Sequence, residues 1–168
     1  LGLAFAPFAL ALLAFAPSAQ ANDFSGTCAQ YPGTYDGTGN VTINNTGACT
    51  LPAITAGGFI HITSSGAITA QALTAGTDLD ITTSGGAITT QALTTSNGDL
   101  KITSATNITT TGAVSSRYAI QANANSGKIA ISGNLASNQS GAGGNILLVA
   151  TGNISTGSIS TNSGGGTA

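Results

Sequence analysis

Apolar and polar residues alternate in short runs along most of the chain. Ile60 and Ile62, for example, are separated by His61 and followed by Thr63. A period of two is typical of a β-strand with one buried face. Groups rich in glycine, serine and asparagine, such as residues 83–86, separate the runs and have the chemistry of turns. Since no stretch keeps the period of a helix, the pattern predicts short strands joined by turns and an all-β fold.

One unit recurs along the chain at intervals of about twenty residues. Residues 66–74 read GAITAQALT and residues 86–94 read GAITTQALT, so the repeat is visible directly. Four apolar positions of each unit align in columns. The first two columns are Val41, Ile60, Leu79, Leu100, Ile120 and Ile146, and Ile43, Ile62, Ile81, Ile102, Ala122 and Leu148. The other two are Cys49, Ile68, Ile88, Ile108, Ile129 and Ile154, and Ile54, Leu73, Leu93, Val114, Leu135 and Ile159.

A solenoid explains this periodicity. Short strands and like residues at like positions indicate a chain in which each coil pairs with the next. Parallel coils connected in one sense are expected to wind right-handed. The sequence therefore predicts a right-handed parallel β-helix of about six coils over residues 41–168, continuing beyond the C-terminus, with an N-terminal cap at residues 22–40. A leucine-rich repeat has a similar period, but its Leu-x-x-Leu-x-Leu-x-x-Asn spacing is not found.

Composition supports a folded but weakly charged protein. Of 168 residues, 41% are hydrophobic, which is enough for a core, whereas only 5% are charged. The formal net charge is -2, with three Lys and Arg residues in total. So few cations cannot neutralise a phosphate backbone, and nucleic acid is not expected as a partner.

The N-terminal segment has the features of an export signal. Residues 1–17 carry no charge and consist mainly of Leu, Ala and Phe, and Ala19 and Ala21 form a small-x-small cleavage pattern. These features predict a signal peptide at residues 1–21. A membrane-spanning helix is the alternative, but Pro7 and Pro17 interrupt a run shorter than about twenty apolar residues. The mature part is expected to be secreted and not to insert into a membrane.

Export makes the two cysteines interpretable. Cys28 and Cys49 would meet an oxidising compartment, so a single disulfide is predicted, tying the cap to the first coil. The alternatives are two free thiols or a metal site. Two cysteines with one distant histidine are a poor ligand set for zinc.

The few charged residues give no catalytic, cofactor-binding or metal site. Asp78 and Asp99 precede equivalent strands and are interpreted as turn-capping residues, with a calcium site or a carboxylate pair as the alternative. His61, Asp80 and Lys101 occupy equivalent outward positions in three consecutive units. They are interpreted as a solvated strip rather than as a nucleophile–base–acid set. No enzyme activity and no cofactor are therefore expected.

Hydroxyl residues form two regular outward ladders. The first is Thr50, Thr69, Thr89, Thr109 and Ser155, and the second is Thr55, Thr74, Thr94, Ser115 and Ser160. Threonine suits the outer face of a strand, which is the structural explanation. The alternative is an ice-binding face. Gln71 and Gln91 are also expected to stack, as a structural amide ladder.

Residues 98–103 and 143–154, read as GDLKIT and GGNILLVATGNI, resemble the repeats of filamentous-haemagglutinin-type proteins. The resemblance covers the chain from about Val41 onward. It implies a β-helical shaft and a structural or adhesive role at the surface of a Gram-negative bacterium, in association with the outer membrane. The implied partners are host-cell or matrix glycans or proteins, or other surface filaments. A polysaccharide-lyase-like β-helix is an alternative, but its converging charged residues are not found among five acids and three bases.

Overall fold

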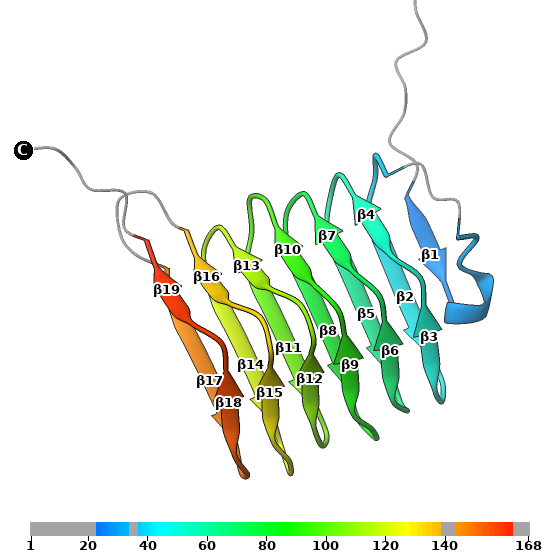
Figure 1. Cartoon of the computed structure of the whole chain (residues 1–168). Helices are drawn as coiled ribbons and strands as arrows, with labels where there is room; N and C mark the ends of the chain where they lie inside the picture. The colour runs from blue at the N-terminus through cyan, green and yellow to red at the C-terminus, as the bar shows by residue number, and fades with distance from the viewer. Residues whose placement is uncertain (1–22, 34–36, 139–143, 163–168) are drawn as a thin grey trace, which may run out of the picture.

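A computed structural model describes residues 23–33, 37–138 and 144–162, which form a parallel β-solenoid of about six coils with almost no helix (Figure 1). Each full coil contributes three short strands, and corresponding strands of successive coils pair in parallel. The predicted all-β parallel β-helix is confirmed, whereas its right-handed winding stays a prediction. The expected signal peptide at residues 1–21 lies outside the described residues.

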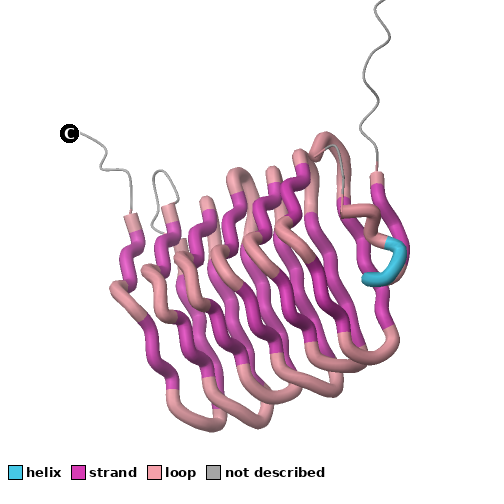
Figure 2. The backbone as a smooth tube through the Cα atoms, turned by 45° about the vertical axis from the view of Figure 1, so that its right-hand side comes forward, coloured by secondary structure: helices cyan, strands magenta, loops and turns pink. Residues whose placement is uncertain are grey.

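Three parallel sheets run along the solenoid (Figure 2). The first sheet contains β1 (Phe24–Gly26), β2 (Val41–Asn45), β5 (Ile60–Ser64), β8 (Leu79–Thr83), β11 (Leu100–Ser104), β14 (Ile120–Ala124) and β17 (Ile146–Ala150). The second contains β3 (Cys49–Leu51), β6 (Ile68–Ala70), β9 (Ile88–Thr90), β12 (Ile108–Thr110), β15 (Ile129–Ile131) and β18 (Ile154–Thr156). The third contains β4 (Ile54–Ala56), β7 (Leu73–Ala75), β10 (Leu93–Thr95), β13 (Val114–Ser116), β16 (Leu135–Ser137) and β19 (Ile159–Thr161).

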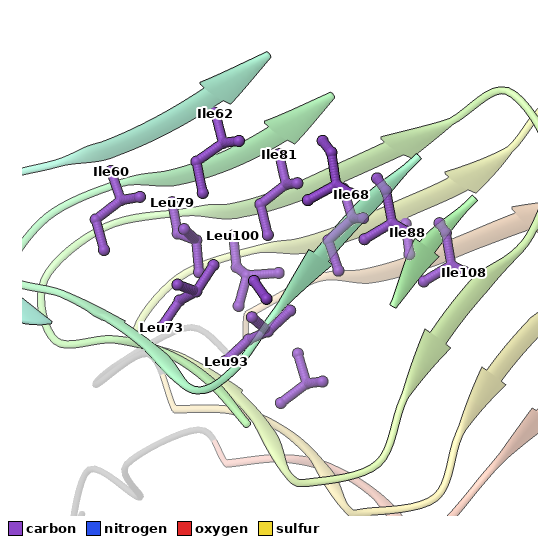
Figure 3. Close-up of a cluster of buried hydrophobic side chains, with 14 of the residues drawn as sticks. Ile60, Ile62, Ile68, Leu73, Leu79, Ile81, Ile88, Leu93, Leu100 and Ile108 are labelled. Atoms are coloured by element: carbon purple, nitrogen blue, oxygen red, sulfur yellow. The ribbon is translucent and has the colours of Figure 1, made fainter. Parts of the chain in front are cut away.

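The four predicted apolar columns form the core. Side chains of the first five coils in these columns are almost completely buried, and Figure 3 shows several of them pointing into the space between the sheets. Register pairs like with like, since Ile62 lies opposite Ile81 and Ile81 opposite Ile102. In the last described coil, Ile154 and Ile159 are 45% and 54% exposed, because β18 and β19 each pair with one neighbour only.

Three further inward columns lie at the last residue of each strand, and the repeat alignment did not assign them. Their members are small, apolar or hydroxyl residues, except for the half-buried Asn45 at the end of β2. The buried hydroxyl members are Ser64, Thr83, Thr90, Thr95, Ser104, Thr110, Ser116 and Ser137. The interior therefore contains more inward columns than the four predicted apolar ones, because alternation carries the inward face to the strand end even where the residue is polar.

A short strand and one turn of helix precede the first full coil. β1 pairs in parallel with β2, and the ring of Phe24 meets Tyr31 edge-on with centroids 5.1 Å apart. Cys28 lies in the 3-10 helix η1 (Cys28–Gln30), at disulfide distance from Cys49, with their Cα atoms 5.6 Å apart. A cap over the whole range 22–40 stays a prediction, since residues 22 and 34–36 lie outside the described part.

Reduction of a Cys28–Cys49 bond is expected to lower the free energy of unfolding by about 3 kcal/mol, because the bond closes a loop and restricts the unfolded chain. The two cysteines are 21 residues apart in sequence. Urea denaturation with and without reductant measures the loss, and peptide mass mapping identifies the linkage. A double variant, Cys28→Ser with Cys49→Ser, should lose any dependence on reductant. Equal stability of the wild-type protein in both conditions would contradict the prediction.

Candidate functional site

The outer face of the first sheet carries a strip of charged side chains. His61, Asp80 and Lys101 occupy neighbouring register positions in β5, β8 and β11. Asp80 accepts a hydrogen bond from the Thr82 hydroxyl at 3.1 Å, and the His61 ring lies against Phe59 with centroids 4.7 Å apart. No hydrogen bond joins the three described side chains of the strip to one another, so their geometry is not that of a proton relay.

Asp78 and Asp99 connect successive coils at the corner before the first sheet. The carboxylate of Asp78 accepts a hydrogen bond from the backbone N–H of Asp99, and that of Asp99 accepts from Ala119, both at 2.9 Å. Asn107 accepts from the N–H of Lys128 in the same way at 3.0 Å. Within the described ranges, no group of three or more His, Cys, Asp or Glu residues is placed to hold a metal ion. The contacts agree with a capping role. Each carboxylate accepts a hydrogen bond from a backbone N–H of the next coil rather than from its own turn.

The two hydroxyl ladders lie on the outer faces of the second and third sheets. Thr50, Thr69, Thr89 and Thr109 are paired in unbroken register, as are Thr55, Thr74, Thr94 and Ser115. In the next coil Ala130 and Ala136 take these positions, and only after them come Ser155 and Ser160. Each ladder therefore has four consecutive hydroxyls, an alanine and a final serine.

A second set of hydroxyls lies inside the solenoid and forms hydrogen bonds to backbone carbonyls at the turns between strands. The Ser104 hydroxyl lies 2.9 and 3.0 Å from the backbone carbonyl oxygens of Gly86 and Asn107, which share its one proton. Ser64 and Thr83 likewise donate to turn carbonyls of the preceding coil. These contacts are structural, because they give the buried hydroxyls their hydrogen-bond partners and join them to the backbone of the turns.

Replacing Ser104 with alanine is expected to lower the free energy of unfolding by about 1–2 kcal/mol, since the two carbonyl oxygens lose the hydroxyl proton that they share and no new donor replaces it. Thermal and urea denaturation measure the change. The matched control is Ser132→Ala, because the Ser132 side chain is exposed. Equal effects of the two substitutions would show that the buried contacts contribute nothing.

A groove of about 340 Å³ follows the outside of the second sheet at the corner that leads to the third sheet. It crosses successive coils, so it runs along the solenoid rather than around it. Its lining comes from β3, β6 and β9, the residues that follow β6 and β9, and the residue that follows β12. The lining residues are Thr50, Leu51, Thr69, Ala70, Gln71, Thr89, Thr90, Gln91 and Thr111.

Five polar side chains of this groove are solvent-exposed and unpaired, whereas the Thr90 hydroxyl is buried and bonded to that of Thr110. The hydroxyls of Thr50, Thr69 and Thr89 and the side-chain amides of Gln71 and Gln91 make no hydrogen bond to any described residue, while their coils pair through the backbone. No hydrogen bond joins the side-chain amides of Gln71 and Gln91, so a hydrogen-bonded amide ladder is not formed, although both exposed side chains line the same groove. Five side chains thus present unused donors and acceptors within one groove.

Comparison with known proteins identifies no relative. No family model, no curated protein and no solved structure matches the chain. Within the described ranges, no helix has the length and apolar character needed to cross a membrane. The groove and the hydroxyl ladders must therefore be interpreted from their own geometry.

Sequence reasoning found the ladder residues of the groove but not the groove itself. Thr50, Thr69 and Thr89 were assigned as outward positions, and the structure brings them together with Gln71 and Gln91. A signal for the buried hydroxyls was present, since Ser64 follows Ile62 by two residues and therefore points to the same side of the strand.

Proposed function

We propose that this protein is a non-enzymatic structural and adhesive protein of the bacterial surface, forming the β-helical shaft of a filamentous-haemagglutinin-like adhesin. The observation that carries the proposal is the continuous stack of about six coils, in which three parallel sheets run through the described residues without a break. Such a stack grows in length with each coil while its cross-section stays constant. Such a stack suits a protein that projects binding regions away from the cell surface.

Projection is the proposed mechanism. Each coil adds about 4.8 Å along the solenoid, the spacing between paired strands. Backbone hydrogen bonds join neighbouring coils in all three sheets, and the inward columns fill the space between them. The shaft therefore resists bending, and its outward hydroxyls and amides remain accessible to host-cell or matrix glycans or proteins, or to other surface filaments.

Binding of the purified protein to glycan arrays, matrix proteins and cultured cells tests the adhesive role. Saturable binding that is lost when the protein is denatured is the expected result. Uniform absence of binding, together with a failure of antibodies to label the protein on intact producing cells, would overturn the proposal.

An ice-binding β-helix is the second candidate, and the unbroken register of Thr50, Thr69, Thr89 and Thr109 is the observation that favours it. Equally spaced hydroxyls and methyls on a rigid face can order water. The interruption of both ladders by Ala130 and Ala136 weakens the regularity of that face. Thermal hysteresis and ice-recrystallisation assays decide between the candidates, and no effect at high protein concentration would remove this one.

A further inference from the structure

The groove beside the second sheet offers hydrogen-bonding groups that repeat along its length. Thr50, Thr69 and Thr89 lie in register on adjacent strands, and Gln71 and Gln91 lie at the same corner of consecutive coils. Successive members are therefore about 4.8 Å apart, the strand-to-strand spacing. A ligand that uses these groups together must itself be extended and must present polar groups at short, regular intervals.

The groove has no charge. None of its nine lining residues is acidic or basic, whereas Asp80 and Lys101 lie on the first sheet. An anionic or cationic polymer would lose solvation here without gaining an ionic partner. Charge complementarity therefore favours an uncharged ligand.

The groove runs across the outer face of the second sheet, and β3 at its N-terminal end is the edge strand of that sheet. Backbone groups of β3, β6 and β9 are committed to bonds between coils, for example Cys49 N–H to Ala67 and Ile68 N–H to Ala87. An extended peptide binds most readily by adding a strand to an open edge. Among the strands that line the groove only β3 is an edge strand, and η1 packs beside it with Cys28 at disulfide distance from Cys49. Recognition must instead use side-chain hydroxyls, amides and threonine methyls.

We propose that the groove lined by Thr50, Thr69, Thr89, Gln71 and Gln91 binds an uncharged oligosaccharide strand laid along the solenoid. Sugar hydroxyls both donate and accept, which matches the threonine hydroxyls and glutamine amides. The threonine methyls provide small apolar contacts for the carbon-bound hydrogens of the sugar rings. The proposal deepens the adhesive function proposed above and rests on it, because it names the class of ligand.

Titration of the isotope-labelled protein with cellohexaose, xylohexaose and mannohexaose, followed by NMR, tests the proposal. Oligogalacturonate of similar length serves as the anionic comparison. At least one neutral hexasaccharide is expected to shift the backbone amides of Thr69 and Thr89 and the side-chain amides of Gln71 and Gln91 in a saturable way. Absence of these shifts at millimolar concentration of all three neutral sugars, or shifts with the anionic sugar alone, would overturn the proposal.

A groove variant, Gln71→Ala with Gln91→Ala, is expected to weaken the binding of that sugar about tenfold, because two side-chain hydrogen bonds are lost. Both side chains are exposed, so the fold should be unaffected, as circular dichroism and the thermal midpoint will show. Gln121→Ala, at an exposed position on the first sheet, is the matched control and should bind as the wild-type protein does. Unchanged affinity in the groove variant would place the sugar elsewhere and refute the assignment.

Cell binding by the same variants separates the two proposals. If the groove variant loses sugar binding and cell binding together, both proposals are supported. If the wild-type protein binds cells but no neutral sugar, the adhesive function stands and the groove assignment fails. If it binds neither cells nor matrix, the adhesive function fails whatever the sugar titration gives.

Discussion

Replacing Ile81 with alanine is expected to lower the free energy of unfolding by about 2–5 kcal/mol, among the largest effects of any single substitution in this fold. The Ile81 side chain is 0% exposed and lies in register between Ile62 and Ile102. Backbone hydrogen bonds hold these coils at a fixed spacing, so the walls cannot close around the missing atoms. The substitution therefore loses both the transfer energy of the side chain and its packing contacts. Urea denaturation followed by circular dichroism measures the loss.

An isoleucine-to-alanine substitution at a position that is exposed rather than buried provides the control. Ile159 belongs to the apolar column of the third sheet in the last described coil and is 54% exposed. Ile159→Ala should cost less than half as much as Ile81→Ala, because the side chain has less surface to lose from the core. If the two variants lost the same stability, burial within the columns would not be the source of the energy.

Gly76→Ala is expected to lower the free energy of unfolding by about 3 kcal/mol, although an alanine normally restricts the unfolded chain and stabilises the fold. Gly76 lies at the corner after β7, and a Cβ there would be 1.9 Å from the carbonyl oxygen of Gly57 and 2.6 Å from its carbon. Both atoms belong to the backbone of the preceding coil. Gly76 also donates its N–H to Ala56 at 2.8 Å, which fixes the distance between the coils. The corner must therefore open, or the hydrogen bond must break.

Gly152→Ala is the matched control for this effect. A Cβ at Gly152 would be 3.2 Å from the nearest atom, the carbonyl oxygen of Gly127, so a small shift relieves the contact. Its stability should remain within about 1 kcal/mol of the wild-type value. A Gly76→Ala protein as stable as the Gly152→Ala protein would mean that the corners are more adaptable than their spacing indicates.

Buried residues could be predicted from the sequence where an apolar side chain recurs at the same position of each repeat. Ile62, Ile81 and Ile102 recur at one position of each unit, and both their spacing and their apolar character indicate burial. Ser104 and Thr110 are just as buried, but hydroxyl residues also occur on outward strand positions, so residue type alone cannot distinguish the two faces. Strand parity carries that information, provided that the strand boundaries are known.

The groove was beyond sequence reasoning for a different reason. Thr69 and Gln71 are only two residues apart, but whether they line one hollow depends on the angle at which β6 leads into β7. That angle is set by packing of the whole coil and has no local sequence signal. The hydrogen-bonding state of Gln71 and Gln91 could not be predicted either, since equal spacing permits both a ladder and two solvated amides.

Equivalence of the coils has a consequence at the level of the gene. Residues 66–74 and 86–94 differ at a single position, so recombination between the segments that encode them would exchange nearly identical units. Loss of residues 69–88 by such an event would join Ile68 directly to Thr89, and every remaining side chain would keep its side of the strand. Duplication of the same segment would add one coil and would also keep every side chain on its side of the strand. Since each coil contacts only its neighbours, gain or loss of one repeat would lengthen or shorten the solenoid by one coil and would leave the packing of the other coils unchanged.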